Sequence, residues 1–359
     1  MTTVRIAVAG ASGYTGVELI RLLAQHPHVE LTTVTSEKSA GLPVASVFPH
    51  LSHAVPLTFE ALEPDALAER ADVIFLALPH TKSMEPVANC MRSKAKIIDL
   101  SADYRLQDAH VYERWYQTVH THAELLERSV YGLPELHRSG IVKSQLVASP
   151  GCYPTAAILQ LAPLAAHGLI DPGTIVIDAK SGVSGAGRSP ALPYHFPEAH
   201  ESLEPYKIGR HRHIPEIEQE LSLLCARQQG GRNSATSSQV TVAFTPHLVP
   251  MNRGILSTAY CRLTNPVLDA AALLSLYKNF YEKERFVRVF EDLVPNPRHV
   301  RGTNYCDLAL FADTRAGWII TVAALDNLIK GAAGQAIQAM NLMLGFPEET
   351  GLTAPAIFP

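Results

Sequence analysis

The segment that most constrains the fold lies at residues 4–26, where an apolar run, a glycine-rich turn and a helical pattern follow one another. Apart from Arg5, residues 4–10 (VRIAVAG) are apolar up to the glycine, which is typical of a central parallel strand buried on both faces. The turn ASGYTG follows, and apolar residues then recur at the helical spacing in residues 15–26. A strand, a glycine turn and a helix in this order predict the first unit of a parallel α/β sheet.

The glycine turn also predicts a ligand. Its glycines have a G-x-x-G-x-x-G spacing. Glycines allow a tight turn and the close approach of a pyrophosphate, while a helix N-terminus offers N–H groups and the positive end of the helix dipole. We therefore predict that this turn binds a dinucleotide, although a glycine turn without a ligand could have the same spacing. The predicted contacts are Gly10, Ser12, Gly13, Tyr14, Thr15 and Gly16.

The end of the next strand indicates which dinucleotide is bound. Residues 29–35 (VELTTVT) predict a strand, and Ser36, Glu37 and Lys38 follow it. A site for NAD places an acidic residue at this tip to bind the ribose hydroxyls. Here Ser36 stands near that place, and Lys38 could pair with a 2′-phosphate. The sequence therefore favours NADP(H), while Glu37 leaves NAD open.

Further strands are predicted at residues 71–79, 95–105 and 144–152. Strands that alternate with helices in this way give a doubly wound parallel sheet, and ligands gather at the carboxyl ends of its strands. Pro79, the segment 101–105 with Arg105, and Cys152 all lie at such ends. We therefore expect these residues to line one site.

Cys152 follows Pro150 and Gly151, and the helical pattern behind it continues to Gly168. A thiol at a helix N-terminus has a lowered pKa, because the dipole and the free amides stabilise the thiolate. The same amides could hold an oxyanion. The chain has five scattered cysteines without a CxxC pair, which predicts neither a disulfide framework nor a metal site. We interpret Cys152 as a nucleophile and the other cysteines as core residues.

A nucleophilic thiol beside a nicotinamide implies chemistry between an aldehyde and an acyl group, and this needs a group that carries a proton near neutral pH. The segment HRHIPEIEQ supplies two histidines immediately before a predicted helix. We take His213 as the first choice and His211 as the alternative. A basic turn that merely caps the helix would have the same composition.

Residues 178–190 (DAKSGVSGAGRSP) follow a predicted strand and are expected to form a flexible loop rich in hydrogen-bond donors. Lys180 and Arg188, together with backbone amides, would suit a phosphate or carboxylate. A polar surface loop is the alternative. Residues 227–239 predict a mobile linker, and a final helix is expected from about Lys330, with Asn327 close to the nicotinamide amide.

Composition narrows the class of protein. With 359 residues, 47% hydrophobic and 18% charged, the chain is long enough for two globular domains. A net charge of -4 argues against a nucleic-acid partner and a polybasic membrane anchor. No apolar run reaches transmembrane length, and no targeting segment is recognised. We expect a cytoplasmic protein, while a mature plastid form stays open.

Seven segments in this order resemble the N-acetyl-gamma-glutamyl-phosphate reductase family. They are GASGYTG, SADYR, SPGCYPTA, DAKSGVSGAGR, HRHIPEIEQ, TPHLVPMNRG and DNLIKGAAGQA. The resemblance spans nearly the whole chain, and the PGCYPTA and SGVSGAGR segments are highly specific. It implies NADPH-dependent reduction of N-acetyl-glutamyl phosphate to the semialdehyde and phosphate, in arginine biosynthesis, through a thioester on Cys152.

The resemblance also implies the architecture and the partners. We expect an NADP-binding domain at residues 1–150, completed by residues 330–359, and an inserted α+β catalytic domain at residues 151–329, as in semialdehyde dehydrogenases. A homo-oligomer, a dimer or a tetramer, is implied. The implied site residues are Cys152 and the HRH histidines for catalysis, Pro79, Ser181, Gly182 and Asn327 for the cofactor, and Arg105, Lys180, Ser184 and Arg188 for the substrate.

Three alternatives stay open at this point. Aspartate-semialdehyde dehydrogenase shares the same cofactor domain and thiol chemistry. An acyl-phosphate reductase of the aminoadipate pathway differs by one methylene in its substrate. A non-catalytic NADP-binding regulator would have an unreactive thiol.

Overall fold

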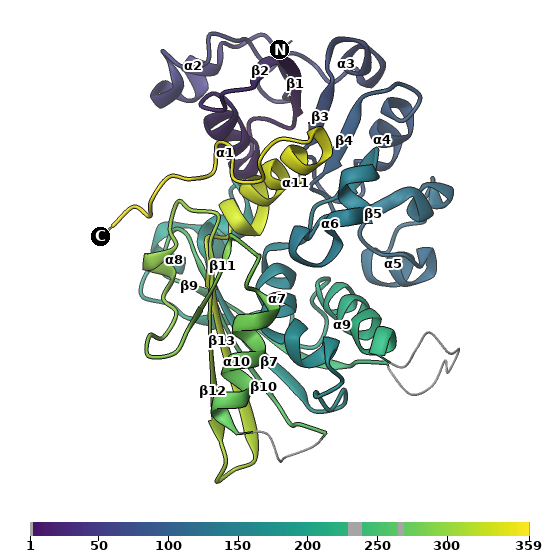
Figure 1. The fold of residues 1–359 in the computed structure, drawn as a ribbon. Helices are drawn as coiled ribbons and strands as arrows, with labels where there is room; N and C mark the ends of the chain where they lie inside the picture. Colours follow the sequence, from purple (N-terminus) through teal and green to yellow (C-terminus); the bar gives the residue numbers. More distant parts are fainter. Residues whose placement is uncertain (1–2, 229–238, 265–268, 359) are drawn as a thin grey trace. The chain divides into compact units, whose positions relative to one another are not determined.

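The computed structural model describes residues 3–228, 239–264 and 269–358 (Figure 1). The chain divides into two compact units. Unit 1 comprises Met1–Gly151 and Ala332–Ala354, and unit 2 comprises Cys152–Gly331 and Pro355–Pro359. Unit 2 is thus inserted into unit 1, and the division falls on the peptide bond before Cys152. Most of the linker predicted at residues 227–239 lies outside the described residues.

Unit 1 contains a parallel sheet with the strand order β2-β1-β3-β4-β6-β5. The strands are β1 (Val4–Ala9), β2 (Val29–Val34), β3 (Val73–Leu76), β4 (Lys96–Asp99), β5 (Ser129–Tyr131) and β6 (Leu146–Ala148). Every pairing in this sheet is parallel. The chain runs from β1 outward to β2 and then returns to the other side of β1 with β3. This reversal confirms the predicted doubly wound sheet and creates the switch point at which such folds bind ligands.

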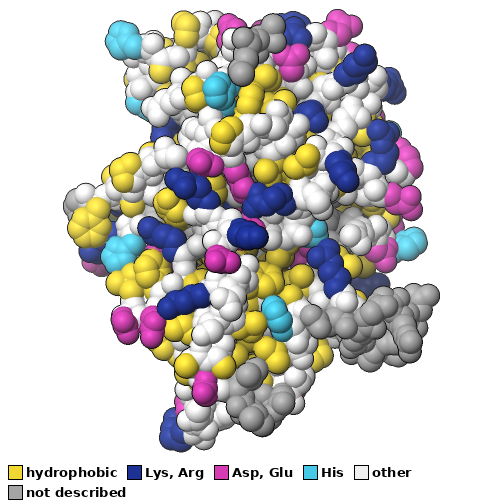
Figure 2. All heavy atoms as spheres, viewed as in Figure 1, with side chains coloured by type: hydrophobic (Ala, Val, Ile, Leu, Met, Phe, Trp, Pro, Cys, Tyr) yellow, Lys and Arg dark blue, Asp and Glu magenta, His cyan; other side chains and the backbone are white. Residues whose placement is uncertain are grey.

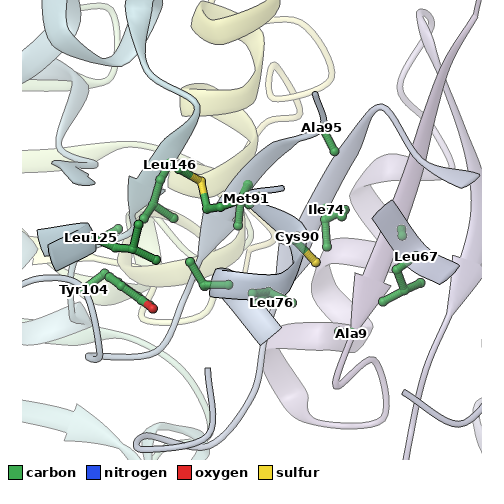
Figure 3. Packing of buried hydrophobic residues seen from close by; sticks show 14 of the residues in the cluster. Ala9, Leu67, Ile74, Leu76, Cys90, Met91, Ala95, Tyr104, Leu125 and Leu146 are labelled. Carbon is green, nitrogen blue, oxygen red and sulfur yellow. The ribbon is translucent and has the colours of Figure 1, made fainter. Parts of the chain in front are cut away.

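The helices of unit 1 are α1 (Tyr14–Leu23), α2 (Val44–Val47), α3 (Pro64–Arg70), α4 (Met84–Cys90), α5 (Ala109–Tyr116), α6 (Pro134–Lys143) and α11 (Gly334–Leu344). The last helix packs against α6, α1 and β4, so the C-terminal part of the chain completes this unit. Figure 3 shows Ile74 and Leu76 of β3 beside Cys90 of α4, in the core cluster that also contains Leu67 and Leu146. These side chains are almost fully buried, as a two-faced parallel sheet requires.

Unit 2 contains a mixed sheet with the order β11-β12-β13-β10-β7-β9-β8. Its strands are β7 (Ile175–Gly182), β8 (Glu204–Pro205), β9 (Val242–Val249), β10 (Ile255–Cys261), β11 (Val287–Phe290), β12 (Cys306–Asp313) and β13 (Trp318–Leu325). Its helices are α7 (Cys152–Ala166), α8 (Phe196–Ala199), α9 (Ile214–Gln228) and α10 (Ala270–Phe280). Helix α7 packs on β10 and β13, α9 on β9, and α10 on β12.

Alternation along the strands separates the two faces of this second sheet. In β10, Ile255, Ser257, Ala259 and Cys261 are buried, whereas the residues between them are more exposed. The opposite face carries a row of large side chains that the register aligns across four strands. This row consists of Phe311, Ile320, Tyr260 and Val176, and three of its members are at least 36% exposed. We call this row the open sheet face.

Short helical turns complete the chain. The 3-10 turns are Pro49–Leu51, Ala123–Arg128, Val183–Ala186, Leu192–Tyr194 and Pro297–His299, and a π-helical turn spans Ile329–Ala333 directly before α11. On the face shown in Figure 2, basic and acidic side chains are interspersed, with hydrophobic side chains among them. No described helix is both long enough and apolar enough to cross a membrane.

The segment predicted as a loop at residues 178–190 differs from the prediction. Strand β7 continues to Gly182, so Lys180 and Ser181 belong to the strand and project from opposite faces. The loop begins only with the 3-10 turn after it. The predicted strand at 95–105 is also shorter, because the hydrogen bonds made by Asp99 bend the chain directly after β4.

Candidate active site

The glycine turn of unit 1 is shaped by two close approaches. Gly10 has φ +74, and a Cβ there would lie 2.3 Å from the carbonyl oxygen of Ala77. A Cβ on Gly16 would lie 2.5 Å from the carbonyl oxygen of Gly10, so α1 sits directly on the turn. Gly13 differs, since a Cβ there would meet nothing closer than 3.6 Å. It is also the N-cap of α1 and has no side-chain cap. The turn therefore leaves space and helix-terminal amides for an anionic group, which fits a dinucleotide pyrophosphate.

The hydroxyls at the tip of β2 are joined to this turn. Ser12 Oγ and Ser36 Oγ are 2.7 Å apart, and the Ser39 N–H donates to Ser36 Oγ at 3.2 Å. Ser36 is buried, whereas Glu37 and Lys38 are exposed. The structure thus brings together two of the predicted cofactor residues. It places a hydroxyl pair, rather than a carboxylate, at the position where NAD sites have an acid.

A buried polar cluster follows β4. The Asp103 carboxylate accepts hydrogen bonds from the Thr81 N–H at 2.7 Å, the Ser83 N–H at 2.8 Å and the Tyr112 hydroxyl at 2.8 Å. Thr81 has φ 70, a left-handed conformation that is rare for a β-branched residue. Burial, with the charge of Asp103 in addition, raises the pKa of Asp99. The hydrogen bonds to the Asp103 carboxylate hold the turn directly after Pro79 in a fixed conformation.

Arg105 is anchored to the strand end that precedes Cys152. Its Nε donates to the Ser149 carbonyl at 2.7 Å, and its Nη2 donates to the Leu100 carbonyl at 2.8 Å. The Arg105 side chain is buried. Arg105 is one of the predicted site residues at the strand ends, whereas the sequence predicts no role for Asp103. The backbone N–H groups that Asp103 binds belong to Thr81 and Ser83, which lie 22 and 20 positions away, so no local pattern indicates this role.

Cys152 is the first residue of α7, as the Pro-Gly pair before it predicted. Its side chain is half-buried, whereas the other four cysteines are buried. Burial raises the pKa of both Cys90 and Cys261 to about 12, so these thiols remain protonated at neutral pH. Gly331, in the π-helical turn, lies against the nucleophile candidate, since a Cβ there would be 2.8 Å from Cys152 Cβ. The close packing fixes the position of the Cys152 backbone.

Aromatic side chains lie beside Cys152. The Tyr206 hydroxyl donates to the Tyr153 hydroxyl at 3.3 Å, which donates in turn to the His247 carbonyl at 3.1 Å. The ring centroids of His211 and His213 lie 5.7 Å and 6.1 Å from that of Tyr153. The structure therefore brings both candidate histidines to the residue that follows Cys152. The sequence analysis missed Tyr206, which carries no recognisable motif of its own.

The two histidines differ in environment. The His211 ring is buried, and its Nδ1 accepts a hydrogen bond from the His213 N–H at 3.2 Å, which places the imidazole proton on Nε2. Burial, together with the charges of Lys207 and Arg212, lowers the pKa of His211 to about 3. His211 is therefore neutral at physiological pH. The His213 ring is less buried and lies 4.7 Å from the His211 ring, centroid to centroid.

The end of β7 forms a second group of predicted residues. Asn327 Oδ1 accepts from the Gly254 N–H at 2.7 Å, and Asn327 Nδ2 donates to Ser184 Oγ at 3.0 Å. A Cβ on Gly182 would lie 2.8 Å from the Arg253 backbone nitrogen, so this position requires glycine. The structure thus brings Ser184 and Asn327 together, with Gly182 and Ser181 on the adjoining strand end.

Lys180 and Arg188, the two cations of this segment predicted to bind the substrate, have different surroundings. Lys180 Nζ pairs with Asp178 Oδ2 at 2.8 Å, and His247 Nδ1 lies 3.0 Å from Asp178 Oδ1. Lys180 and Asp178 project from the face of the sheet opposite to Ser181, because side chains alternate along β7. Arg188 is exposed in the segment after the 3-10 turn. In the described parts of the chain, no group of three or more histidine, cysteine, aspartate or glutamate residues could hold a metal ion.

Comparisons with known proteins show the family of this chain. Residues 5–144 match the semialdehyde dehydrogenase NAD binding domain, and residues 152–327 match the semialdehyde dehydrogenase dimerisation domain. The N-acetyl-gamma-glutamyl-phosphate reductase of Geotalea daltonii is 53% identical over 357 residues, which cover 99% of each chain. That of Citrifermentans bemidjiense is 51% identical, over 99% of this chain and 100% of the relative.

The chain belongs to the N-acetyl-gamma-glutamyl-phosphate reductase family. This reductase is an oxidoreductase with a nicotinamide-dinucleotide domain, as the sequence predicted. Its fold is also found in solved structures. Aspartate semialdehyde dehydrogenase II from Vibrio cholerae superposes with a TM-score of 0.70 at 15% identity, covering 96% of this chain and 99% of that chain. The Candida albicans aspartate semialdehyde dehydrogenase, solved with NADP, gives 0.65 at 16%, covering 96% and 99%. At these identities the likeness establishes the fold alone.

Proposed function

We propose that this reductase converts N-acetyl-L-glutamyl 5-phosphate into N-acetyl-L-glutamate 5-semialdehyde and phosphate with NADPH, as a step of arginine biosynthesis. One observation carries the chemistry. Cys152 is a half-exposed thiol at the first position of a 15-residue helix, with two histidines beside the next residue. The names of the relatives supply the substrate, and the glycine turn of unit 1 supports the cofactor.

Cys152 performs the first step. The N-terminal amides and the dipole of α7 favour its thiolate over the thiol. Its sulfur attacks the acyl carbon, so that a C–S bond forms and the bond between that carbon and the phosphate oxygen breaks, with the electron pair leaving on phosphate. The first amides of α7 have no acceptors within the helix and can donate to the carbonyl oxygen as it becomes negative. The product is a thioester on Cys152.

The second step releases the aldehyde. When bound, NADPH supplies a hydride, which reduces the thioester carbon. The α7 amides hold the resulting negative oxygen, and its collapse to the aldehyde breaks the C–S bond. We assign the proton that the sulfur receives to His213, because His211 is neutral and its Nδ1 is occupied by the His213 N–H. His211 then orients the segment that carries His213.

The shape of the glycine turn indicates which residues would hold the cofactor. Gly10, Gly13 and Gly16 with the first amides of α1 would hold the pyrophosphate, and Ser12 with Ser36 would face the adenosine ribose. Exposed Lys38 is the predicted partner of the 2′-phosphate. The remaining predicted cofactor contacts are Tyr14, Thr15, Pro79, Ser181, Gly182 and Asn327. For the substrate, Arg105, Ser184 and Arg188 stay predicted contacts, whereas the ion pair of Lys180 with Asp178 supports a structural role for that lysine.

We further propose that two copies associate through the open sheet face. The dimerisation domain of the family covers this sheet, and Tyr260, Val176 and Phe311 are exposed hydrophobic side chains in one row across it. Exposed apolar rows of this kind mark protein interfaces. A tetramer and a cytoplasmic location remain predictions from the sequence.

The reverse reaction tests the proposed function. Purified protein should reduce NADP⁺ with N-acetylglutamate semialdehyde only when phosphate is present, and Cys152→Ser should lower the rate by at least about a thousandfold, since the nucleophile is lost. The semialdehydes of aspartate and of N-acetyl-aminoadipate serve as comparison substrates. A higher kcat/KM with either of them, or a Cys152→Ser protein with most of its activity, would refute the proposal.

A further inference from the structure

Lys207 lies in a turn whose backbone is fixed on both sides. The preceding Tyr206 N–H donates to the Pro246 carbonyl at 3.0 Å, and the Arg210 N–H donates to the Lys207 carbonyl at 3.0 Å. Between these bonds Lys207 has φ 47. This left-handed conformation is unfavourable for a residue with a Cβ, and residues of this kind cluster at functional sites. The turn lies four residues before His211.

The lysine is close to the catalytic groups of unit 2. Tyr206, the residue before it, donates its hydroxyl to Tyr153 at 3.3 Å. After burial, the charge of Lys207 is the largest contribution that lowers the pKa of His211. The ring of His211 lies 5.5 Å from that of Tyr206 and 5.7 Å from that of Tyr153. Lys207 thus lies in the turn between Tyr206 and His211, both of which contact Tyr153, the residue after Cys152.

Lys207 differs from other cations of unit 2 in its ion pairing. Among the residues that the structure describes, no carboxylate forms an ion pair with it. Two other cations of unit 2 differ, because Lys180 pairs with Asp178 and Arg253 pairs with Asp326. Burial, with the charge of Arg212 in addition, lowers the pKa of Lys207. Lys207 is exposed, and an ammonium beside another cation is stabilised when an anion binds.

We propose that the Lys207 ammonium binds an anionic group of the acyl-phosphate substrate. The inference rests on the proposed function and adds a specificity residue to it. The substrate carries two such groups, the phosphoryl group at the reacting end and the carboxylate at the other, and both accept hydrogen bonds from an ammonium. Binding of either group supplies a counter-charge that no carboxylate in the described parts of the chain provides.

Arg210 provides a matched control. It belongs to the same turn, carries the same charge, is exposed and has no ion pair among the described residues. It differs in one respect, since its charge does not contribute to the lowered pKa of His211. Loss of the Arg210 charge therefore changes the net charge of the turn without removing a cation that acts on the site.

The first experiment measures the reverse reaction, in which phosphate and semialdehyde are separate substrates. We expect Lys207→Met to raise the KM of one of them by about ten- to a hundredfold, the effect of losing one charge-assisted hydrogen bond. A raised KM for phosphate identifies the phosphoryl group as the ligand, and a raised KM for semialdehyde identifies the carboxylate. The KM for NADP⁺ should stay unchanged, Lys207→Arg should restore most of the loss, and Arg210→Met should resemble the wild type.

The second experiment does not depend on turnover. Iodoacetate and iodoacetamide alkylate a thiolate by displacing iodide, and they differ in that iodoacetate carries a carboxylate. Cys152 is the half-buried cysteine, so it should react first. We expect Lys207→Met to lower the ratio of the iodoacetate rate to the iodoacetamide rate by about two- to fivefold, the range for one partly exposed charge. Arg210→Met should leave the ratio unchanged.

These measurements separate the two proposals. If the wild type shows no phosphate-dependent reaction, the proposed function fails, and the alkylation ratio alone decides whether Lys207 attracts anions to Cys152. If the wild type is active, unchanged KM values in Lys207→Met overturn the inference whatever the ratio. A fall in kcat without a change in either KM, or an equal effect of Arg210→Met, also overturns it.

Discussion

Replacing Gly331 with alanine should displace the nucleophile without unfolding the protein. The added Cβ would lie 2.8 Å from Cys152 Cβ, 3.2 Å from Cys152 Cα and 3.3 Å from Leu325 Cδ1. Ordinary contacts begin at 3.4 Å, so the first residue of α7 must move by about 0.6 Å. A misplacement on the order of 1 Å can cost roughly a hundredfold in rate, so we expect kcat to fall by about ten- to a hundredfold.

The stability of the Gly331→Ala protein should change far less than its activity. Alanine in a helical turn gains about 1 kcal/mol over glycine, and overpacking costs about 1–3 kcal/mol, so the net loss should lie between about 0 and 2 kcal/mol. The assays are kcat in the reverse reaction, the rate of Cys152 alkylation by iodoacetamide and urea unfolding. Gly173→Ala is the control, because a Cβ there meets only Asp171 Oδ1, at 3.7 Å. Wild-type kcat and alkylation rate in Gly331→Ala would refute the reasoning.

Three further changes test other parts of the structure. His211 has a pKa near 3 in the folded protein and about 6.5 in the unfolded chain, so it contributes stability above pH 6.5 that is lost as the pH falls. Between pH 6 and pH 5, the free energy of urea unfolding should therefore fall by about 1 kcal/mol more in the wild type than in His211→Asn. Equal losses in the two proteins would contradict the lowered pKa. Ser36→Asp places a carboxylate at the tip of β2 and should lower the ratio of kcat/KM for NADPH to that for NADH by at least about tenfold; an unchanged ratio would mean that this tip does not face the 2′-phosphate. Tyr260→Asp puts a charge on the open sheet face and should shift the protein toward monomers in sedimentation velocity, whereas Val142→Asp, at an exposed apolar position of unit 1, should not.

The sequence predicts most of unit 1, because its signals are local. An apolar strand, the glycine turn and the helical spacing behind it predict β1 and the start of α1 to within one residue, while α1 ends at Leu23, three residues before the predicted end. Pro-Gly before Cys152 predicts the start of α7. The short strand β5 was not predicted, since three residues at a sheet edge carry no detectable periodicity. Nor does any local pattern specify the Asp103 network, which joins residues about 20 positions apart.

Lys180 shows why the composition of a segment does not predict the surroundings of its cations. In a flexible loop, every donor of residues 178–190 could turn toward one ligand, and the density of cationic and polar side chains would then indicate a binding site. In a strand, neighbours project from opposite faces, so the extension of β7 to Gly182 separates Lys180 from Ser181. The same alternation places Lys180 beside Asp178, where its charge is neutralised. Lys207 carries a weaker sequence signal, yet its turn precedes His211 and leaves its charge without a carboxylate among the described residues. A cation is available to bind a substrate when the fold leaves its charge uncompensated, and the number of basic residues in a segment does not reveal this.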